Sequence, residues 1–146
     1  MKIALPIENT LILYKDNPHT APKFAIYDVE KIQNNIHFSL YSIIENKLSQ
    51  VKNGEFDKKE KKCSCDEQRE NNLRHKCDHY SLVEALNGCS YLLANKYCKN
   101  TKNSMKNGGI KIFKIPPIIN KIDLAIKNFI IGDSLANQIK QIHHAS

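Results

Sequence analysis

The chain has 146 residues, 41% of them hydrophobic, which is enough for one domain with its own core. Its formal net charge of +7 is compatible with a nucleic-acid partner. However, arginine is scarce, tryptophan is absent, and many lysines stand beside Asn or Glu as on a solvated surface. The sequence therefore argues against specific nucleic-acid binding. Because there is no secretion signal and no apolar run near the ~18 residues that cross a bilayer, we expect a cytoplasmic protein with no membrane partner.

Three strands are predicted in the first part of the chain, at Lys2–Ile7, Lys23–Val29 and Ile36–Ile44. In the third strand, apolar residues such as Ile36 and Leu40 alternate with polar ones. One face of this strand should therefore be covered and the other solvated. Strands that follow one another in this way are expected to form a meander.

The pattern changes to helix and strand after residue 78. A helix is predicted from His79, and Asn87-Gly88 should stop it before a buried strand at Cys89–Ala94. Cys89 begins this largely apolar strand, where cysteine usually acts as a small hydrophobe. We therefore assign Cys89 to the core and exclude it as a metal ligand.

A second helix, capped by Asn100 or Thr101, should precede a fifth strand at Ile110–Phe113. The clearest helical pattern runs over Asn120–Gly132, where the glycine should end the helix and Asp133 should cap the next one. The whole order of elements predicts an α/β fold, in which a five-stranded mixed sheet is flanked by helices. We expect a single domain covering residues 1–146.

A strongly polar insertion is predicted at about residues 46–78, and it is rich in metal-binding side chains. Between residues 58 and 79 the chain carries Cys63, Cys65, His75, Cys77 and His79. Thiolate and imidazole groups bind zinc, copper and iron-sulfur centres, and so hydrophilic a segment could not bury its cysteines in an ordinary core. Metal or cluster binding is therefore the working hypothesis.

The first two cysteines of this segment cannot complete a tetrahedral site by themselves, so ligands must return across the loop. The predicted principal set is Cys63, Cys65, Cys77 and His79, with His75 and His19 as spare ligands. The spacing lacks the paired Cys-x-x-Cys pattern of zinc ribbons, yet zinc is chemically as acceptable as a cluster in these ligands. A flexible loop with reactive thiols is the other interpretation.

Six strings spread over nearly the whole chain can be compared with known families. They are Met1–Ile7, Ala21–Val29, Cys77–His79, Gly88–Ala94, Gly109–Ile112 and Asp123–Ile126. Their order and spacing resemble the dinitrogenase iron-molybdenum cofactor biosynthesis family, which includes NifX-like proteins and proteins like the C-terminal domain of NifB. The resemblance implies a ribonuclease-H-like topology. It also implies a protein that holds or passes on iron-sulfur or mixed-metal clusters without catalysing a reaction.

The chain departs from this family at two turns. Where family members carry Ser-x-His-Phe-Gly-Arg-Ala, this chain has Asn17–Ala21, and His19 lies near the family histidine but out of register with it. The glycine-rich turn of the family is replaced by a lysine-rich one. There Cys98, with Lys96 and Lys99 nearby, could bind a soft metal inside an electropositive rim, because positive charge favours the thiolate. An exposed cysteine in a lysine-rich turn is the alternative.

No nucleophile elbow, phosphate-binding loop or dinucleotide-binding loop is present, so catalysis has little support. We expect a non-catalytic carrier or assembly chaperone for an iron-sulfur or mixed-metal cluster, whose partner is a protein that donates or accepts the cluster. A second copy of the chain is a further candidate partner. Two alternatives stay open. One is a zinc-stabilised module that binds a protein or nucleic acid through its lysines, and the other is a redox sensor in which Cys63, Cys65 and Cys77 exchange disulfides.

Overall fold

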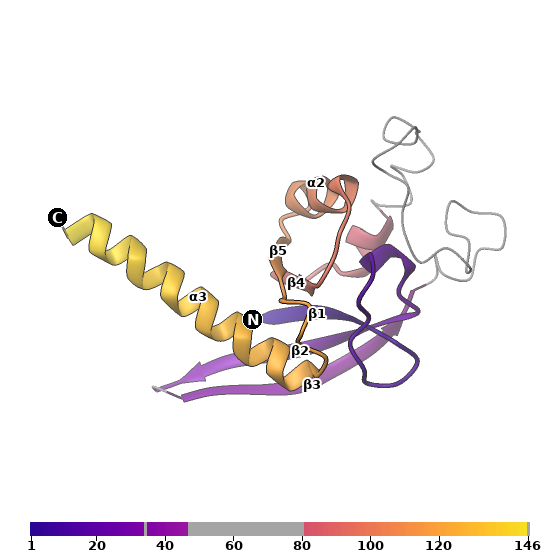
Figure 1. Cartoon of the computed structure of the whole chain (residues 1–146), viewed down its shortest axis with the longest axis horizontal. Helices are drawn as coiled ribbons and strands as arrows, with labels where there is room; N and C mark the ends of the chain where they lie inside the picture. Colours follow the sequence, from indigo (N-terminus) through magenta and orange to yellow (C-terminus); the bar gives the residue numbers. More distant parts are fainter. Residues whose placement is uncertain (34, 47–80, 146) are drawn as a thin grey trace.

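The computed structural model describes residues 1–33, 35–46 and 81–145. Its strands are β1 (Lys2–Ile7), β2 (Lys23–Ile32), β3 (Asn35–Glu45), β4 (Tyr91–Ala94) and β5 (Lys111–Lys114). They form one sheet in the order β3-β2-β1-β4-β5 (Figure 1). Antiparallel pairing joins β1 to β2 and β2 to β3, whereas β1, β4 and β5 run parallel. The predicted five-stranded mixed sheet is confirmed, and the ribonuclease-H-like assignment stays a prediction.

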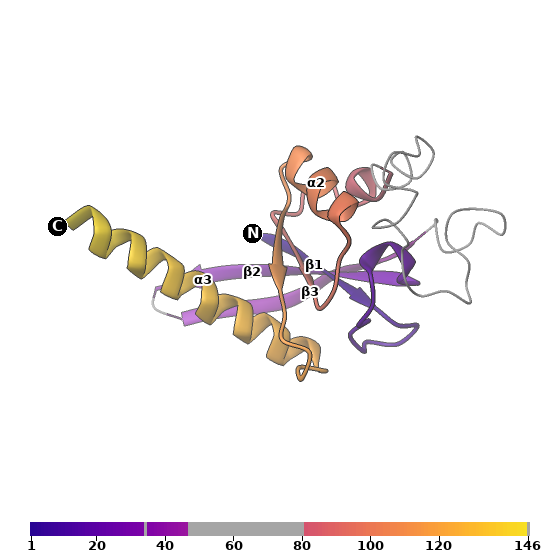
Figure 2. The ribbon, with the colours of Figure 1, turned by 45° about the horizontal axis from the view of Figure 1, so that its top comes forward.

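The helical elements of the described ranges are η1 (Pro18–Thr20), α2 (Lys99–Asn107) and α3 (Ile122–Ala145), together with a helical turn at residues 81–85. The helices α2 and α3 lie on opposite sides of the sheet, and α3 continues beyond the strands to the C-terminus (Figure 1, Figure 2). Among these helices none has both the length and the apolar character of a membrane span. With helices on both sides of a mixed sheet, the chain has the predicted α/β architecture.

Two apolar cores lie on the two faces of the sheet, because successive side chains of a strand point to opposite sides. Ile3 and Leu5 of β1 face the core under α3, whereas Ala4 faces the core under α2. In the α3 core the ring centroid of Phe129 lies 5.2 Å from that of Phe113 in β5. Full burial of a phenylalanine contributes about 1.5–3 kcal/mol. This contact therefore helps to hold α3 on the sheet.

The helix α3 does not end at Gly132, and Asp133 does not cap a separate helix, so both predictions were wrong. The glycine has a packing role instead. A Cβ added at Gly132 would lie 2.8 Å from Cζ of Phe113. Glycine inside a helix is about 1 kcal/mol less favourable than alanine, and here it allows the helix to pass close to an aromatic ring of β5.

The edge strand β3 lacks the single covered face that its alternating sequence predicts. Ile36 is 37% exposed and Leu40 is 44% exposed. The register of the pairing with β2 shifts midway along the strand, which changes the side of the sheet to which later residues point. Phe38 consequently packs against the α3 core and Ile44 against the α2 core. The irregularity divides one apolar stripe between two faces.

Asn46, at the start of the polar insertion predicted at about residues 46–78, is bound to the sheet edge and to the loop that follows β1. Its side chain is 4% exposed, and its amide donates hydrogen bonds of 2.8 Å to the carbonyl oxygens of His19 and Ala21. The remainder of the predicted insertion, at residues 47–78, lies outside the described residues. Asn46 therefore ties the end of β3 to the loop that carries His19.

Candidate functional site

Two of the predicted ligands lie in loops that follow neighbouring parallel strands. His19 is in η1, after β1, and Cys98 lies between β4 and α2. Because β1 and β4 pair in parallel, their carboxyl ends meet at one edge of the sheet. Ligands of open α/β sheets commonly bind at this edge. The topology thus brings together two residues that are distant in sequence.

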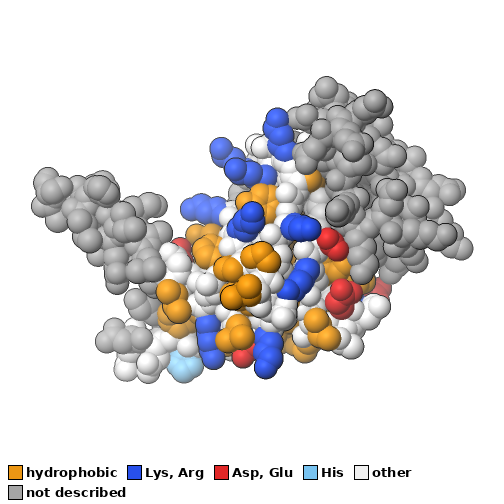
Figure 3. All heavy atoms as spheres, in the orientation of Figure 1, with side chains coloured by type: hydrophobic (Ala, Val, Ile, Leu, Met, Phe, Trp, Pro, Cys, Tyr) orange, Lys and Arg blue, Asp and Glu red, His pale blue; other side chains and the backbone are white. Residues whose placement is uncertain are grey.

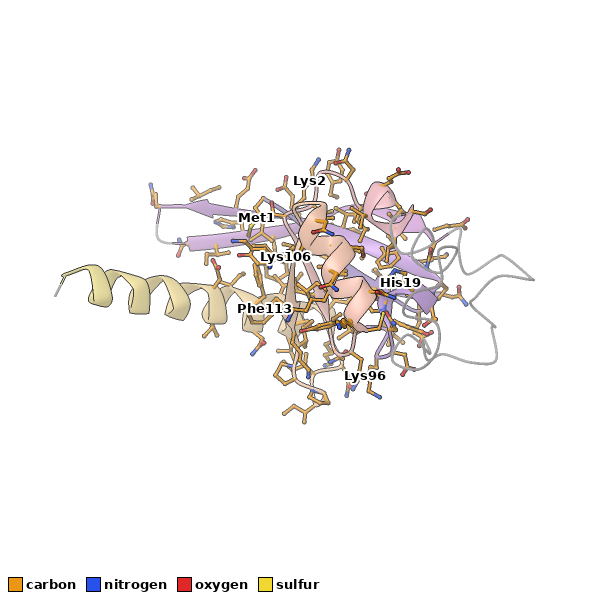
Figure 4. The ribbon with its side chains drawn as sticks, turned by 90° about the horizontal axis from the view of Figure 1, so that it is seen from above. Met1, Lys2, His19, Lys96, Lys106 and Phe113 are labelled. Carbon is orange, nitrogen blue, oxygen red and sulfur yellow. The ribbon has the colours of Figure 1, made fainter. Side chains whose placement is uncertain are left out.

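The Thr101 hydroxyl connects the two side chains. Its Oγ1 atom lies 2.7 Å from His19 Nδ1, 3.0 Å from Cys98 Sγ and 3.2 Å from Asn17 Oδ1. All four side chains are buried, and His19 lies beside α2 (Figure 4). We refer to Asn17, His19, Cys98 and Thr101 as the His19–Cys98 site.

The local sequence explains the position of His19. Asn17 precedes η1, and its Oδ1 atom accepts a hydrogen bond of 3.4 Å from the backbone N–H of His19. Pro18 follows at the first helical position, where its fixed φ angle suits a helix start and no N–H is needed. The short Asn-Pro-His sequence therefore turns the chain and directs His19 into the interior.

The position of Cys98 follows from the start of α2. Its Sγ atom caps the helix and accepts a hydrogen bond of 3.4 Å from the backbone N–H of Thr101. The prediction that Asn100 or Thr101 caps this helix was wrong, because both lie inside its first turn. The cap position puts the sulfur at the positive end of the helix dipole, which favours negative charge.

A second group of hydrogen bonds supports the loop that carries His19. Thr20 Oγ1 donates to the carbonyl of Asn17 at 2.8 Å and lies 2.5 Å from the phenol oxygen of Tyr14. Burial raises the pKa of the Tyr14 phenol, so it stays protonated near neutral pH. With the two bonds from Asn46, the loop is held at several points along its length.

The hydrogen bonds of the site admit a proton arrangement that suits metal binding. An amide oxygen only accepts, and a threonine hydroxyl has one proton, so Thr101 can donate that proton to Asn17 Oδ1 and accept a hydrogen bond from the His19 ring. His19 Nδ1–H is then a donor to Thr101 Oγ1. In this tautomer Nε2 carries the lone pair of the ring. Metal-bound histidines are commonly held in this way, with the other ring nitrogen donating to an oxygen.

Among the described side chains, those of residues 1–30, 32–33, 35–46 and 81–133, no group of three or more His, Cys, Asp or Glu could hold a metal ion. The His19–Cys98 site offers two candidate ligands. The other predicted ligands, Cys63, Cys65, His75, Cys77 and His79, lie outside the described residues.

The side chain of Cys98 is only 7% exposed, because its sulfur caps α2. The alternative prediction of an exposed cysteine in this turn was therefore wrong. Lys96 and Lys99 are exposed on either side of it in the sequence. The assignment of Cys89 to the core is confirmed. Cys89 packs in the α2 core, and burial raises the pKa of its thiol.

Sequence reasoning missed three residues that position the site, Asn17, Asn46 and Thr101. An Asn-Pro pair signals a turn, so Asn17 had a detectable signal. Thr101 was recognised only as a candidate helix cap. Nothing in the polar run after β3 distinguishes Asn46, whose role depends on a loop distant in sequence.

No family model matches the chain, and no curated protein matches it. Among solved structures, the chain is similar to the NMR structure of a Thermotoga protein provisionally named NifB and assigned to the DUF35 family. The TM-score is 0.51 and the identity 21%, over 90% of this chain and 88% of that one. It is also similar to the crystal structure of the protein PH0822, with a TM-score of 0.53 and 14% identity over 90% and 92% of the two chains. Identities this low show a shared fold.

Proposed function

We propose that this protein is a non-catalytic carrier or assembly chaperone for an iron-sulfur or related metal cluster. The observation that carries the proposal is the meeting of His19 and Cys98 at the Thr101 hydroxyl. Imidazole and thiolate are ligands of such centres. A carrier needs ligands that can be exchanged. His19 and Cys98 supply only two ligands, and a set that other residues must complete suits exchange better than a closed four-ligand site.

We propose that the insertion completes the ligand set. Cys63, Cys65, Cys77 and His79 would be its principal ligands and His75 a spare. The attachment of the segment supports this proposal, since Asn46, the last described residue before it, holds the backbone of His19. The cluster is the cargo of the protein in this proposal, and zinc in the same ligands is the chemical alternative.

The distribution of charge supports an anionic cargo. Residues 85–122 contain seven lysines and no aspartate or glutamate. Two of these lysines, Lys96 and Lys99, are sequence neighbours of Cys98 and would contribute to cofactor binding. Clusters held by thiolates carry negative charge, and a basic surface raises the local concentration of anions.

We further propose a relationship to the NifX-like proteins of dinitrogenase iron-molybdenum cofactor biosynthesis. The six sequence strings support it, and so does the fold shared with a protein provisionally named NifB. From this relationship we infer that the protein is cytoplasmic, and that it receives its cluster from one assembly protein and gives it to another. A homodimer is part of the same proposal.

Anaerobic loading with iron and sulfide, followed by metal analysis and absorption spectroscopy, tests the function. We expect iron, sulfide and visible absorption in the wild-type protein, their loss in Cys77→Ser and reduced occupancy in Cys98→Ser. Serine is itself a good helix cap, so the second variant separates loss of a ligand from loss of the fold.

Cys89→Ser is the matched control. It should keep its full metal content and lose about 1–3 kcal/mol of stability, because a hydroxyl is buried in the α2 core. Full metal content in Cys77→Ser would remove the proposal. A wild-type protein that takes up zinc but no iron would instead support the zinc-stabilised module.

A further inference from the structure

A cleft of about 440 Å³ opens between α2 and the edge strand β5. Three lysines, two isoleucines, Tyr97 and Gly109 line it. Ligand pockets commonly have volumes of about 300–1,000 Å³ and combine an apolar lining with a few polar groups. The cleft shares no lining residue with the His19–Cys98 site.

The lysines of the cleft are Lys102 and Lys106, one turn apart on α2, and Lys111 at the start of β5. In the part of the chain that the structure describes, none of the three forms an ion pair. Lys106 lies in the last turn of α2, where the helix dipole favours a cation, but like charges four positions apart on a helix repel by about 0.2–0.5 kcal/mol. Figure 3 shows lysine side chains gathered over α2 and β5. A bound anion would neutralise them.

The apolar part of the lining comes from Ile110, Ile112 and the ring of Tyr97. Ile110 is buried in the α2 core, and Ile112 packs against the same core, so this wall is held by the fold. A small inorganic anion would leave the apolar wall in water, and an uncharged apolar molecule would leave three ammonium groups without a counterion. The lining therefore suits a ligand with a flat apolar ring and several negative charges.

We propose that this cleft binds a nucleoside di- or triphosphate. The base would lie against the apolar wall, where an aromatic face contributes through stacking, and the phosphates would contact the three lysines. The lining holds no Asn, Gln, Asp, Glu, Ser or Thr side chain that could distinguish one base from another. Adenine and guanine nucleotides should consequently bind alike. The proposal is for binding only, and it goes beyond cluster carriage.

Isothermal titration of the metal-free protein with ADP, GDP, adenosine and tripolyphosphate at low salt tests the proposal. ADP and GDP should bind with similar affinities, tripolyphosphate more weakly and adenosine not measurably. The affinity for ADP should fall as the salt concentration rises. Amide chemical shifts of Gly109 and Ile110 should move on addition of ADP, which locates the site.

Lys106→Gln should weaken ADP binding by about five- to tenfold, because one charge-assisted contact is lost. Lys127→Gln, on the exposed side of α3 and on the other face of the sheet, is the matched control and should change the affinity less than about twofold. Thermal melts check that both variants are folded.

Equal effects of the two substitutions, or adenosine binding as well as ADP, would overturn the proposal. If a short single-stranded oligonucleotide displaced ADP and bound more tightly than ADP, the cleft would be reassigned to nucleic acid. Because the measurement uses metal-free protein, its result is independent of cluster binding.

Discussion

The hydroxyl of Thr101 lies 2.7 Å from Nδ1 of His19, and this contact joins the start of α2 to the loop that follows β1. Both side chains are fully buried. The same hydroxyl lies 3.0 Å from the sulfur of Cys98. One oxygen atom therefore fixes both ligand-type side chains of the described site, and its removal has predictable consequences.

Thr101→Val replaces this hydroxyl by a methyl group of similar size. Because it removes the contacts that His19 Nδ1 and Asn17 Oδ1 make with a buried hydroxyl, we expect a loss of about 1–3 kcal/mol of stability in urea unfolding. Thr101→Ser keeps the hydroxyl and should lose less. If the two variants were equally stable, the hydroxyl would have no structural role.

Asn46→Asp tests the anchor of the His19 loop. A carboxylate cannot donate to the carbonyl oxygens of His19 and Ala21, so the variant should lose about 1–3 kcal/mol at neutral pH. Burial beside two carbonyls should raise the pKa of the introduced carboxyl group, and stability should then recover as the pH falls and the group is protonated. Asn46→Ala, which has no titrating group, is the control. Parallel pH profiles of the two variants would contradict the prediction.

Gly132→Ala tests the contact between α3 and β5. The added Cβ lies 2.8 Å from Cζ of Phe113, and relief of this overlap should cost about 1–3 kcal/mol, which exceeds the gain of about 1 kcal/mol in helix propensity. In a Phe113→Leu background the overlap is reduced, and the same substitution should be neutral or stabilising. Chemical unfolding of the four proteins measures the coupling. An identical effect of Gly132→Ala in both backgrounds would show that the ring does not limit the helix.

Stability at alkaline pH should depend on Tyr14. Burial raises its pKa above the ordinary value of 10.0, so the folded pKa lies above the unfolded one. The contribution of the Tyr14 phenol to the free energy of unfolding is then complete below about pH 10, and it is lost as the pH rises through the pKa of the folded state. Tyr14→Phe should be less stable at pH 8 by about 0.5–1.5 kcal/mol, since the bond to Thr20 is absent.

Above pH 10 the stability of Tyr14→Phe should fall less steeply than that of the wild-type protein, because phenylalanine does not ionise. Urea unfolding between pH 8 and pH 11 gives both slopes. Equal slopes for Tyr14→Phe and the wild-type protein would contradict the prediction.

The sequence by itself determined the elements whose patterns are local. The short apolar run Lys2–Ile7 predicted β1 with the bounds that it has in the structure. The order of strands and helices was enough to predict a mixed α/β sheet, because few arrangements of such elements bury one face of each. The core position of Cys89 followed from its apolar neighbours in the same way.

Contacts between distant segments were decided only by the tertiary structure. Gly132 looked like a helix end because a glycine's local preference is to stop helices, and only the ring of Phe113 from another element explains why it stands inside one. The covered face of β3 was mispredicted because the shift in its register depends on pairing with β2. His19 and Cys98 were each identified as candidates from residue type. Their meeting at Thr101 required the parallel pairing of β1 with β4, which no local pattern contains.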